Sequence, residues 1–180
     1  MLRFLKKVVY DSSLQRKISF LKGLELFKDL SHREISRLAH SLHSRTYHEG
    51  EVLFLEGDIG RALFILESGK VELTRRDSSG KARLIYTLGA GEFFGEMALL
   101  EQLPRTASAT AVERSHLYLL YRSKLDSLLH SQPKIGMSIM THLAQILSAR
   151  LRRTTQMALF EAPQGSPAPS SEGPRPQAHG

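Results

Sequence analysis

An acidic and a basic side chain flank one short stretch of the sequence, and together they could recognise a charged ligand. The stretch, FGEMALLEQLPRTASATA, covers residues 94–111 and contains Glu96 and Arg105. A helical turn that starts at Gly95 would offer main-chain amides to an anion, because the first amides of a helix have no partners within it. Arg105 adds a planar, permanently charged fork that matches two phosphate oxygens. Glu96 repels a phosphate but accepts hydrogen bonds from hydroxyl groups, so the pair suits a sugar phosphate.

Two other interpretations of this stretch are less favoured. A surface salt bridge between Glu96 and Arg105 would contribute at most about 1 kcal/mol, and it explains neither Gly95 nor the proline before the arginine. A dinucleotide fingerprint would need the spacing GxGxxG, whereas Gly89, Gly91 and Gly95 are spaced GxGxxxG and no βαβ unit surrounds them. The sugar phosphate remains the better explanation.

Short strands must position this stretch. From Gly50 to Tyr121 the sequence consists of apolar or alternating runs, separated by turns such as Gly57-Asp58 and Ser68-Gly69. Strands of this kind with glycine turns about every 8 to 15 residues predict a small barrel or sandwich. The stretch at 94–111 is the one helical insertion in this series.

Helices are predicted on both sides of the strands. Ser31 can cap a helix, and Glu34 is the acid of a capping box. After Arg122 helix returns, breaks at Pro133 and continues as a longer helix over about 134–158. The apolar stripe of this helix, Ile139 to Leu151, is wide enough to pack on the barrel and on a second surface, so it predicts a homodimer.

The two ends of the chain differ in composition. Residues 1–22 are basic and amphipathic, which predicts a helical segment that contacts a partner or a membrane surface, or packs on its own domain. Residues 161–180 are rich in proline and glycine, which predicts a disordered tail. Residues 23–160 then form the single domain expected of a chain of 180 residues.

Composition narrows the function classes. The chain has no cysteine, which excludes disulfides, thiolate metal sites and thiol nucleophiles and makes the cytoplasm the default location. No apolar run approaches the roughly 20 residues that span a bilayer. The formal charge of +7 suits a polyanionic partner, but the charges are spread along the chain, which favours a solvated basic surface.

The sequence of residues 94–111 resembles the phosphate-binding cassette of cyclic nucleotide-binding domains, whose pattern is F-G-E, an aliphatic residue, A-L, a spacer and P-R-[STA]-A. The resemblance extends from about Leu26 to Leu151 and is of the type found in catabolite activators and protein kinase A regulatory subunits. It implies an α+β, mainly β fold: a β-roll (a double-stranded β-helix of jelly-roll type) with N-terminal helices and a long C-terminal helix. The chain departs from the pattern at Arg61, where an acid is common, and at Met97, where leucine or isoleucine is.

The same resemblance implies a set of binding residues. Glu96 would accept the ribose 2′-hydroxyl, and Arg105 would clamp the cyclic phosphate. The full set is Gly95, Glu96, Met97, Ala98, Arg105, Thr106 and Ala107. The ligand would be a 3′,5′-cyclic mononucleotide. A hydroxyl residue at the position of Thr106 can favour guanine in relatives, but cAMP-preferring members also carry Thr or Ser there, so cAMP is favoured over cGMP. Thr154 and Thr155 on the C-terminal helix, the family's usual lid, are candidate contacts to the base.

The predicted function is therefore a cyclic nucleotide sensor that signals by repositioning its C-terminal helix, with Pro133 and Gly136 as the hinge. An enzyme is not expected. A metal enzyme on a cupin-like fold would need several converging ligands, yet His116 is the only histidine between Gly50 and Tyr121. His40, His43 and His48 could form a site, but scattered surface histidines are favoured, and no Ser-His-Asp arrangement is evident.

Alternative partners stay open. Specific DNA binding is not expected, because the residues after Phe160 are too few and too rich in proline for a helix-turn-helix. Basic surfaces could still bind nucleic acid without specificity. A protein-interaction or membrane-docking module with a degenerate pocket is the main rival. A cyclic dinucleotide is less favoured, since Glu96 and Arg105 suit a single ribose and phosphate. The sequence does not identify the downstream protein.

Overall fold

The computed structural model describes the backbone of residues 2–161 and the side chains of residues 12–156. The chain forms two compact units, residues 1–145 and 146–180. The helices are α1 (Leu2–Lys22), the 3-10 turn η1 (Glu25–Phe27), α2 (His32–Ser41), α3 (Met97–Leu100), α4 (Arg122–Ser131) and α5 (Pro133–Glu161). The strands are β1 (His43–Tyr47), β2 (Val52–Phe54), β3 (Ala62–Ser68), β4 (Val71–Arg76), β5 (Ala82–Leu88), β6 (Phe93–Phe94), β7 (Ser108–Ala111) and β8 (Ser115–Tyr121).

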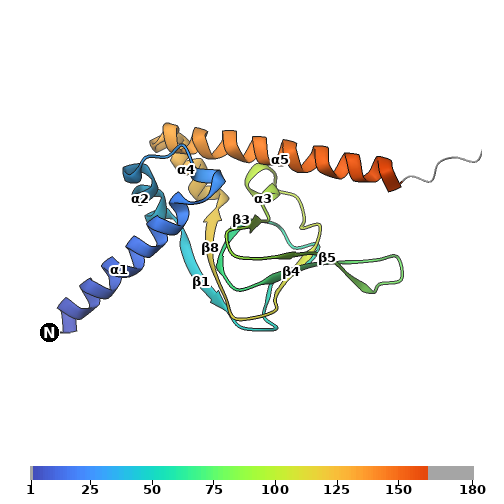
Figure 1. The fold of residues 1–180 in the computed structure, drawn as a ribbon, viewed down its shortest axis with the longest axis horizontal. Helices are drawn as coiled ribbons and strands as arrows, with labels where there is room; N and C mark the ends of the chain where they lie inside the picture. The colour runs from blue at the N-terminus through green and yellow to red at the C-terminus, as the bar shows by residue number, and fades with distance from the viewer. Residues whose placement is uncertain (1, 162–180) are drawn as a thin grey trace, which may run out of the picture. The chain divides into compact units, whose positions relative to one another are not determined.

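Two antiparallel sheets of four strands each form the centre of the first unit (Figure 1). Their strand orders are β1-β8-β3-β6 and β2-β7-β4-β5, so each sheet combines strands from both halves of the sequence. Apolar side chains from both sheets form one core; its members are Tyr47, Ala62, Phe64, Leu66, Val71, Leu88, Phe94, Ala109, Ala111, Leu117 and Leu119. This arrangement confirms the predicted mainly β roll with flanking helices.

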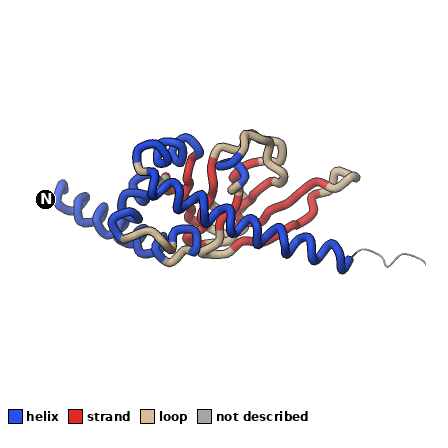
Figure 2. Tube along the Cα trace, turned by 90° about the horizontal axis from the view of Figure 1, so that it is seen from above, coloured by secondary structure: helices blue, strands red, loops and turns tan. Residues whose placement is uncertain are grey.

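The helices α1, α2 and α4 gather at one end of the strands (Figures 1 and 2). The predicted capping box is present at the start of α2: the Glu34 amide donates to Ser31 Oγ, and the Ser31 amide donates to Glu34 Oε2. The apolar face of α2 is buried, including Ile35 and Leu38. The cap and the apolar face together explain why this segment is a helix in this position.

α5 starts at Pro133, where the sequence predicts a break. Proline is favoured in the first turn of a helix because its missing amide hydrogen would have no partner there. In the first unit, Ile135, Ile139 and Leu143 are buried, and Lys134 Nζ lies 3.1 Å from Glu34 Oε1. In the second unit the side chain of Leu151 is 68% exposed.

Some elements of the structure are not predicted from the sequence, and one predicted segment lies outside the described residues. The strands β1 and β6 are additional to the predicted runs, and α1 covers the segment predicted to be helical. The predicted tail lies outside the described residues from residue 162 onward. Among the described helices, none is long and apolar enough to cross a membrane.

Candidate functional site

Arg105 lies in the loop between α3 and β7, and two main-chain carbonyls fix its guanidinium. Nη1 donates to the Gly95 carbonyl at 3.1 Å, and Nη2 donates to the Ala62 carbonyl at 2.9 Å. The main chain of Arg105 is also held, because its amide donates to the Asp58 carbonyl at 2.7 Å and its carbonyl accepts from the Gly57 amide at 2.9 Å. The loop that carries the arginine is thus joined to the turn between β2 and β3.

Aromatic rings of the core support the same guanidinium. The Arg105 Cζ atom lies 4.2 Å from the ring centroid of Phe54 and 5.6 Å from that of Phe64. Phe64 in turn stacks on Phe94, with centroids 5.3 Å apart and an interplanar angle of 12°. A cation over an aromatic face gains about 0.5 to 2 kcal/mol, depending on how far it is desolvated. The arginine is therefore oriented by the core before any ligand arrives.

The charge of Arg105 is only partly compensated. Burial lowers the pKa of Arg105, while the carboxylates of Asp58 and Glu96 act in the opposite direction. An arginine stays protonated at any physiological pH. The side chain is half-buried, so its positive charge is less screened than on the open surface, and an anion placed beside it would gain correspondingly.

Two glycines make room for the guanidinium. Gly95 has φ +71°, and a Cβ added there would lie 2.5 Å from Arg105 Nη1. A Cβ at Gly60 would lie 2.8 Å from the Cβ of Ala98 and 3.3 Å from Arg105 Cζ. Any other residue at either position would collide with the arginine or with the helix turn beside it. The requirement for Gly95 is therefore both conformational and steric.

The structure brings most of the predicted site residues together around this turn. Gly95 and Glu96 are half-buried and directly precede α3, whose Met97 is 47% exposed and Ala98 buried. The Ala98 amide already has an acceptor, because it donates to the Gly95 carbonyl at 3.2 Å. Its role in holding phosphate would require it to share or exchange this hydrogen bond and stays a prediction.

The remaining predicted residues lie farther along the chain. Thr106 is exposed and Ala107 half-buried, directly after Arg105. Thr154 and Thr155 belong to the second unit, where the Thr154 hydroxyl donates to the Arg150 carbonyl at 3.1 Å. Their contact with a base also stays a prediction.

Exposed apolar side chains surround the turn. They come from the β2–β3 connection, from α3 and from the loop after it, and they are Leu55, Ile59, Met97, Leu100 and Leu103. An isolated bridge joins Ile59 to Pro104, so the first and last of these segments lie side by side. We call these five residues the apolar rim. A rim of this kind is more stable when another apolar surface covers it.

Sequence reasoning missed the residues that support the arginine. Phe54 and Phe64 occur in apolar strand runs, where a core role explains them fully, and nothing in the local pattern distinguishes them. Gly60 was also missed, although a glycine between a turn and a buried strand can indicate close approach of another segment. Among the described residues no group of three or more histidine, aspartate or glutamate side chains is placed to hold a metal ion.

The chain is similar in sequence to known proteins. Residues 44–132 match the family model described as the cyclic nucleotide-binding domain. The chain is 39% identical over 132 residues to the cyclic AMP receptor protein of Thermus thermophilus, covering 73% of this chain and 59% of that protein. It is 35% identical over 127 residues to a cAMP-dependent protein kinase regulatory subunit of Yarrowia lipolytica, covering 69% and 33%.

The fold is similar to solved structures as well. A cyclic nucleotide-binding domain from Methylobacillus flagellatus superimposes with a TM-score of 0.74 at 28% identity, and the match covers 87% of each chain. The chain spans between a third and three fifths of the length of the two curated relatives. The similarity thus concerns a ligand-binding domain rather than these relatives as a whole.

Proposed function

Because the chain belongs to the cyclic nucleotide-binding domain family, we propose that it binds a 3′,5′-cyclic mononucleotide at residues 94–111. The observation that carries the proposal is Arg105, a half-buried cation fixed by the carbonyls of Ala62 and Gly95 and by the Phe54 ring. Its environment holds the charge in place without burying it completely. Such a cation suits a singly charged cyclic phosphate.

The proposed roles follow from the chemistry of each group. A guanidinium has five N–H donors, of which two account for the carbonyl contacts, so donors remain for phosphate oxygens. Glu96 would accept a hydrogen bond from the ribose 2′-hydroxyl, while Met97 and Ala98 would contribute amides and Thr106 a hydroxyl. We favour cAMP over cGMP, since the names of both relatives refer to cAMP. Thr154 and Thr155 would contact the base.

Signalling would follow from linkage between binding and conformation. A ligand shifts an equilibrium only by its difference in affinity for the two states. The apolar rim around α3 gives the closed state a surface to cover. At Gly136 an added Cβ would lie 2.8 Å from the Leu129 side chain, so α4 and α5 pack closely beside Pro133, the proposed hinge. A regulatory, non-catalytic role and a cytoplasmic location belong to the same proposal.

Calorimetry with cAMP and cGMP tests the binding proposal. Wild-type protein should bind at least one of the two, and Arg105→Ala should lose roughly 2 to 5 kcal/mol, about thirty-fold to several thousand-fold in affinity. Arg83→Ala is the matched control, because Arg83 pairs with Asp77 on the exposed β4–β5 hairpin. Wild-type protein that binds neither nucleotide would favour the rival module with a degenerate pocket. Unchanged binding by Arg105→Ala would place the site elsewhere.

We also propose that the chain forms a homodimer through the stripe from Ile139 to Leu151; because Ile139 and Leu143 are buried within the first unit, the contact would be made by the second unit. Ile146 and Leu147 are half-buried there, and Leu151 is 68% exposed, so apolar surface is available along one helix. Light scattering should report a dimer for the wild type and a monomer for Leu151→Glu. A wild-type monomer at high micromolar concentration, with and without ligand, would contradict this. The downstream protein partner is not identified, and contact of residues 1–22 with a membrane surface remains a prediction.

A further inference from the structure

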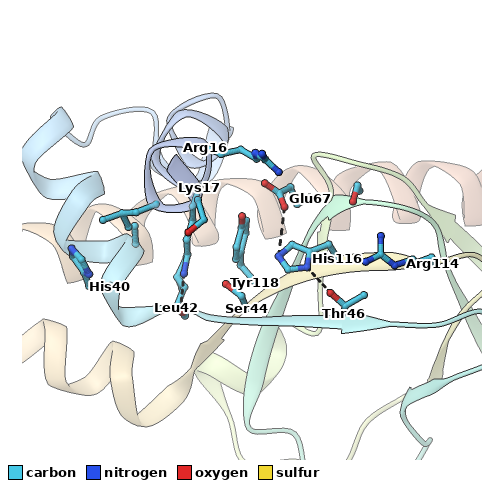
Figure 3. Close-up of a pocket in the computed structure, with 14 residues that line it drawn as sticks. Arg16, Lys17, His40, Leu42, Ser44, Thr46, Glu67, Arg114, His116 and Tyr118 are labelled. Atoms are coloured by element: carbon cyan, nitrogen blue, oxygen red, sulfur yellow. Dashed lines mark hydrogen bonds and ion pairs between the residues drawn. The ribbon is translucent and has the colours of Figure 1, made fainter. Parts of the chain in front are cut away.

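A pocket lies in the first unit, between α1 and the sheet β1-β8-β3-β6 (Figure 3). Its volume is about 620 Å³, and its lining residues come from α1, the end of α2, β1, the end of β3 and the start of β8. None of these lining residues belongs to the stretch 94–111. The volume falls in the range of small-molecule sites, which is about 300 to 1,000 Å³.

The pocket forms because the contact between α1 and the sheet is apolar near the end of α1 and polar one turn earlier. Near the end of α1, Ile18 and Leu21 are buried, and the Phe20 ring lies 5.8 Å from the Tyr118 ring. One turn earlier the helix presents Arg16 instead. Apolar packing therefore closes one end of the interface and leaves the other end polar and hollow.

The floor of the pocket is a polar strip on a sheet whose other face is core. Side chains alternate between the two faces of a strand, and Leu117 and Leu119 of β8 enter the core while His116 and Tyr118 face the pocket. Across the sheet, Thr46 pairs with His116 and Ser44 with Tyr118. The polar strip thus comprises two neighbouring strands.

These polar groups are held in defined positions. His116 Nδ1 lies 2.9 Å from Thr46 Oγ1, and its Nε2 lies 3.6 Å from Glu67 Oε2. Lys17 is only 8% exposed; its Nζ donates to the Leu42 carbonyl at 2.7 Å and lies 4.8 Å from the centre of the Tyr118 ring. The floor of the pocket is therefore ordered, whereas Arg16 and Arg114 at its sides are exposed.

The charge of the lining is strongly positive. Arg16, Lys17 and Arg114 line the pocket together with a single carboxylate, Glu67. Figure 3 shows Arg16 and Arg114 on either side of the Glu67–His116 pair. Arginines match phosphate oxygens, and a carboxylate between them can accept hydrogen bonds from hydroxyl groups.

We propose that this pocket is a second ligand site, which binds a sugar phosphate. Arg16 and Arg114 bind the phosphate, and Glu67 accepts hydrogen bonds from the sugar hydroxyls. Because Arg16 belongs to α1 and the other two residues to the sheet region, the bound ligand joins α1 to the sheet. The site is separate from the cyclic nucleotide site and does not depend on it.

The experiment uses the full chain with Arg105→Ala, which removes the cassette arginine as a competing phosphate contact. Ribose 5-phosphate, ribose and inorganic phosphate are titrated while amide shifts are followed by NMR. Ribose 5-phosphate should shift the amides of Thr46, Glu67 and His116 in a saturable manner, and ribose should not. Shifts confined to residues 94–111, or no saturable shift, would overturn the proposal.

Variants of the lining residues then test the roles. Arg16→Gln with Arg114→Gln should weaken ribose 5-phosphate binding roughly tenfold or more, whereas Arg83→Gln should leave it unchanged. Glu67→Gln should strengthen inorganic phosphate more than ribose 5-phosphate, because removal of the negative charge favours both phosphate groups, whereas only the sugar phosphate loses a charged acceptor for its hydroxyls. Equal affinity in the double arginine variant would overturn the site. Equal changes in affinity for both probes in Glu67→Gln would overturn the assignment of the sugar contact.

Discussion

Gly95→Ala tests two requirements at this position of the cassette: a positive φ angle and space for the guanidinium of Arg105. The residue has φ +71°, a conformation that costs a residue with a Cβ about 1 to 2 kcal/mol. An added Cβ would also lie 2.5 Å from Arg105 Nη1 and 3.4 Å from the Ala62 carbonyl oxygen. These two contacts involve the cation and one of the carbonyls that orient it. The substitution should therefore reduce both stability and affinity.

The size of each effect can be worked out separately. The conformational cost alone predicts a loss of about 1 to 2 kcal/mol in the free energy of unfolding. The contact of 2.5 Å with Arg105 Nη1 forces the guanidinium to move, since the backbone of Gly95 is fixed by the turn into α3. Displacing the guanidinium from the phosphate removes a charge-assisted hydrogen bond, worth about 1.5 to 3 kcal/mol. Affinity for cAMP should thus fall by roughly ten-fold to more than a hundred-fold.

Gly80→Ala is the matched control for this variant. Gly80 has φ +80° in the β4–β5 hairpin, and a Cβ there would have no heavy atom within 4 Å. Urea denaturation should show a loss of stability in both variants, larger in Gly95→Ala because of the added collision with Arg105, whereas calorimetry should show lost affinity only in Gly95→Ala. Wild-type affinity in a folded Gly95→Ala protein would refute the conclusion that the position of Arg105 Nη1 matters for binding. Lost affinity in both variants would show that strain alone is responsible.

Two further predictions concern a buried cation and an aromatic support. Burial lowers the pKa of Lys17 to about 8 from 10.5, so above pH 8 the unfolded chain binds more protons than the folded one and the free energy of unfolding rises with pH. Urea denaturation should therefore show that the wild type gains about 2 kcal/mol from pH 7 to pH 10 relative to Lys17→Met. Parallel pH profiles of the two proteins would contradict this. Phe54→Leu should weaken cAMP binding about threefold to tenfold because a cation–π contact is lost, and Phe54→Tyr should restore it. Phe20→Leu, which alters a ring beside Tyr118, should not affect affinity in calorimetry; equal loss in both leucine variants would point to general destabilisation.

The elements that sequence predicts well are those with a local cause. The α2 helix has its cap and capping box within four residues, Ser31 to Glu34. The strands after Gly50 have apolar runs bounded by glycine turns. In contrast, β1 reads HSRTY, and only Tyr47 of its five residues is buried, so it lacks the apolar pattern of a strand. Its strand conformation comes from pairing with β8, which is a tertiary effect.

The candidate site shows the same division. Glu96 and Arg105 could be singled out because their types and spacing indicate a ligand. Phe54 and Phe64 could not, since an aromatic residue in a strand is explained by core packing alone, and their contact with Arg105 depends on how two segments meet. Lys17 likewise appeared as one of many basic residues in the first 22. Only the fold shows that it is buried against Tyr118.

The energetics of α5 limit how a ligand could move it. Two polar contacts join its first half to the region of η1 and α2: the ion pair of Lys134 with Glu34, and the contact of His142 Nε2 with Asp29 Oδ2, both at 3.1 Å. One partner in each contact is well exposed, so each contact contributes on the order of 1 kcal/mol. Breaking both therefore costs about 2 kcal/mol, which a roughly thirty-fold difference in ligand affinity between the two states supplies.

Exposing the buried face of α5 would cost more free energy than breaking its two polar contacts. Ile135, Ile139 and Leu143 are at most 2% exposed, and fully exposing such side chains costs about 1.5 to 3 kcal/mol each. A ligand cannot offset that sum through the same thirty-fold difference, so a movement about Pro133 must bury these side chains elsewhere or keep their contacts intact. The apolar rim around α3 is a surface that could receive apolar side chains as the cassette closes. Conformational signalling by this chain would then be an exchange of one set of apolar contacts for another. The ligand would supply only the remaining free-energy difference between the two states.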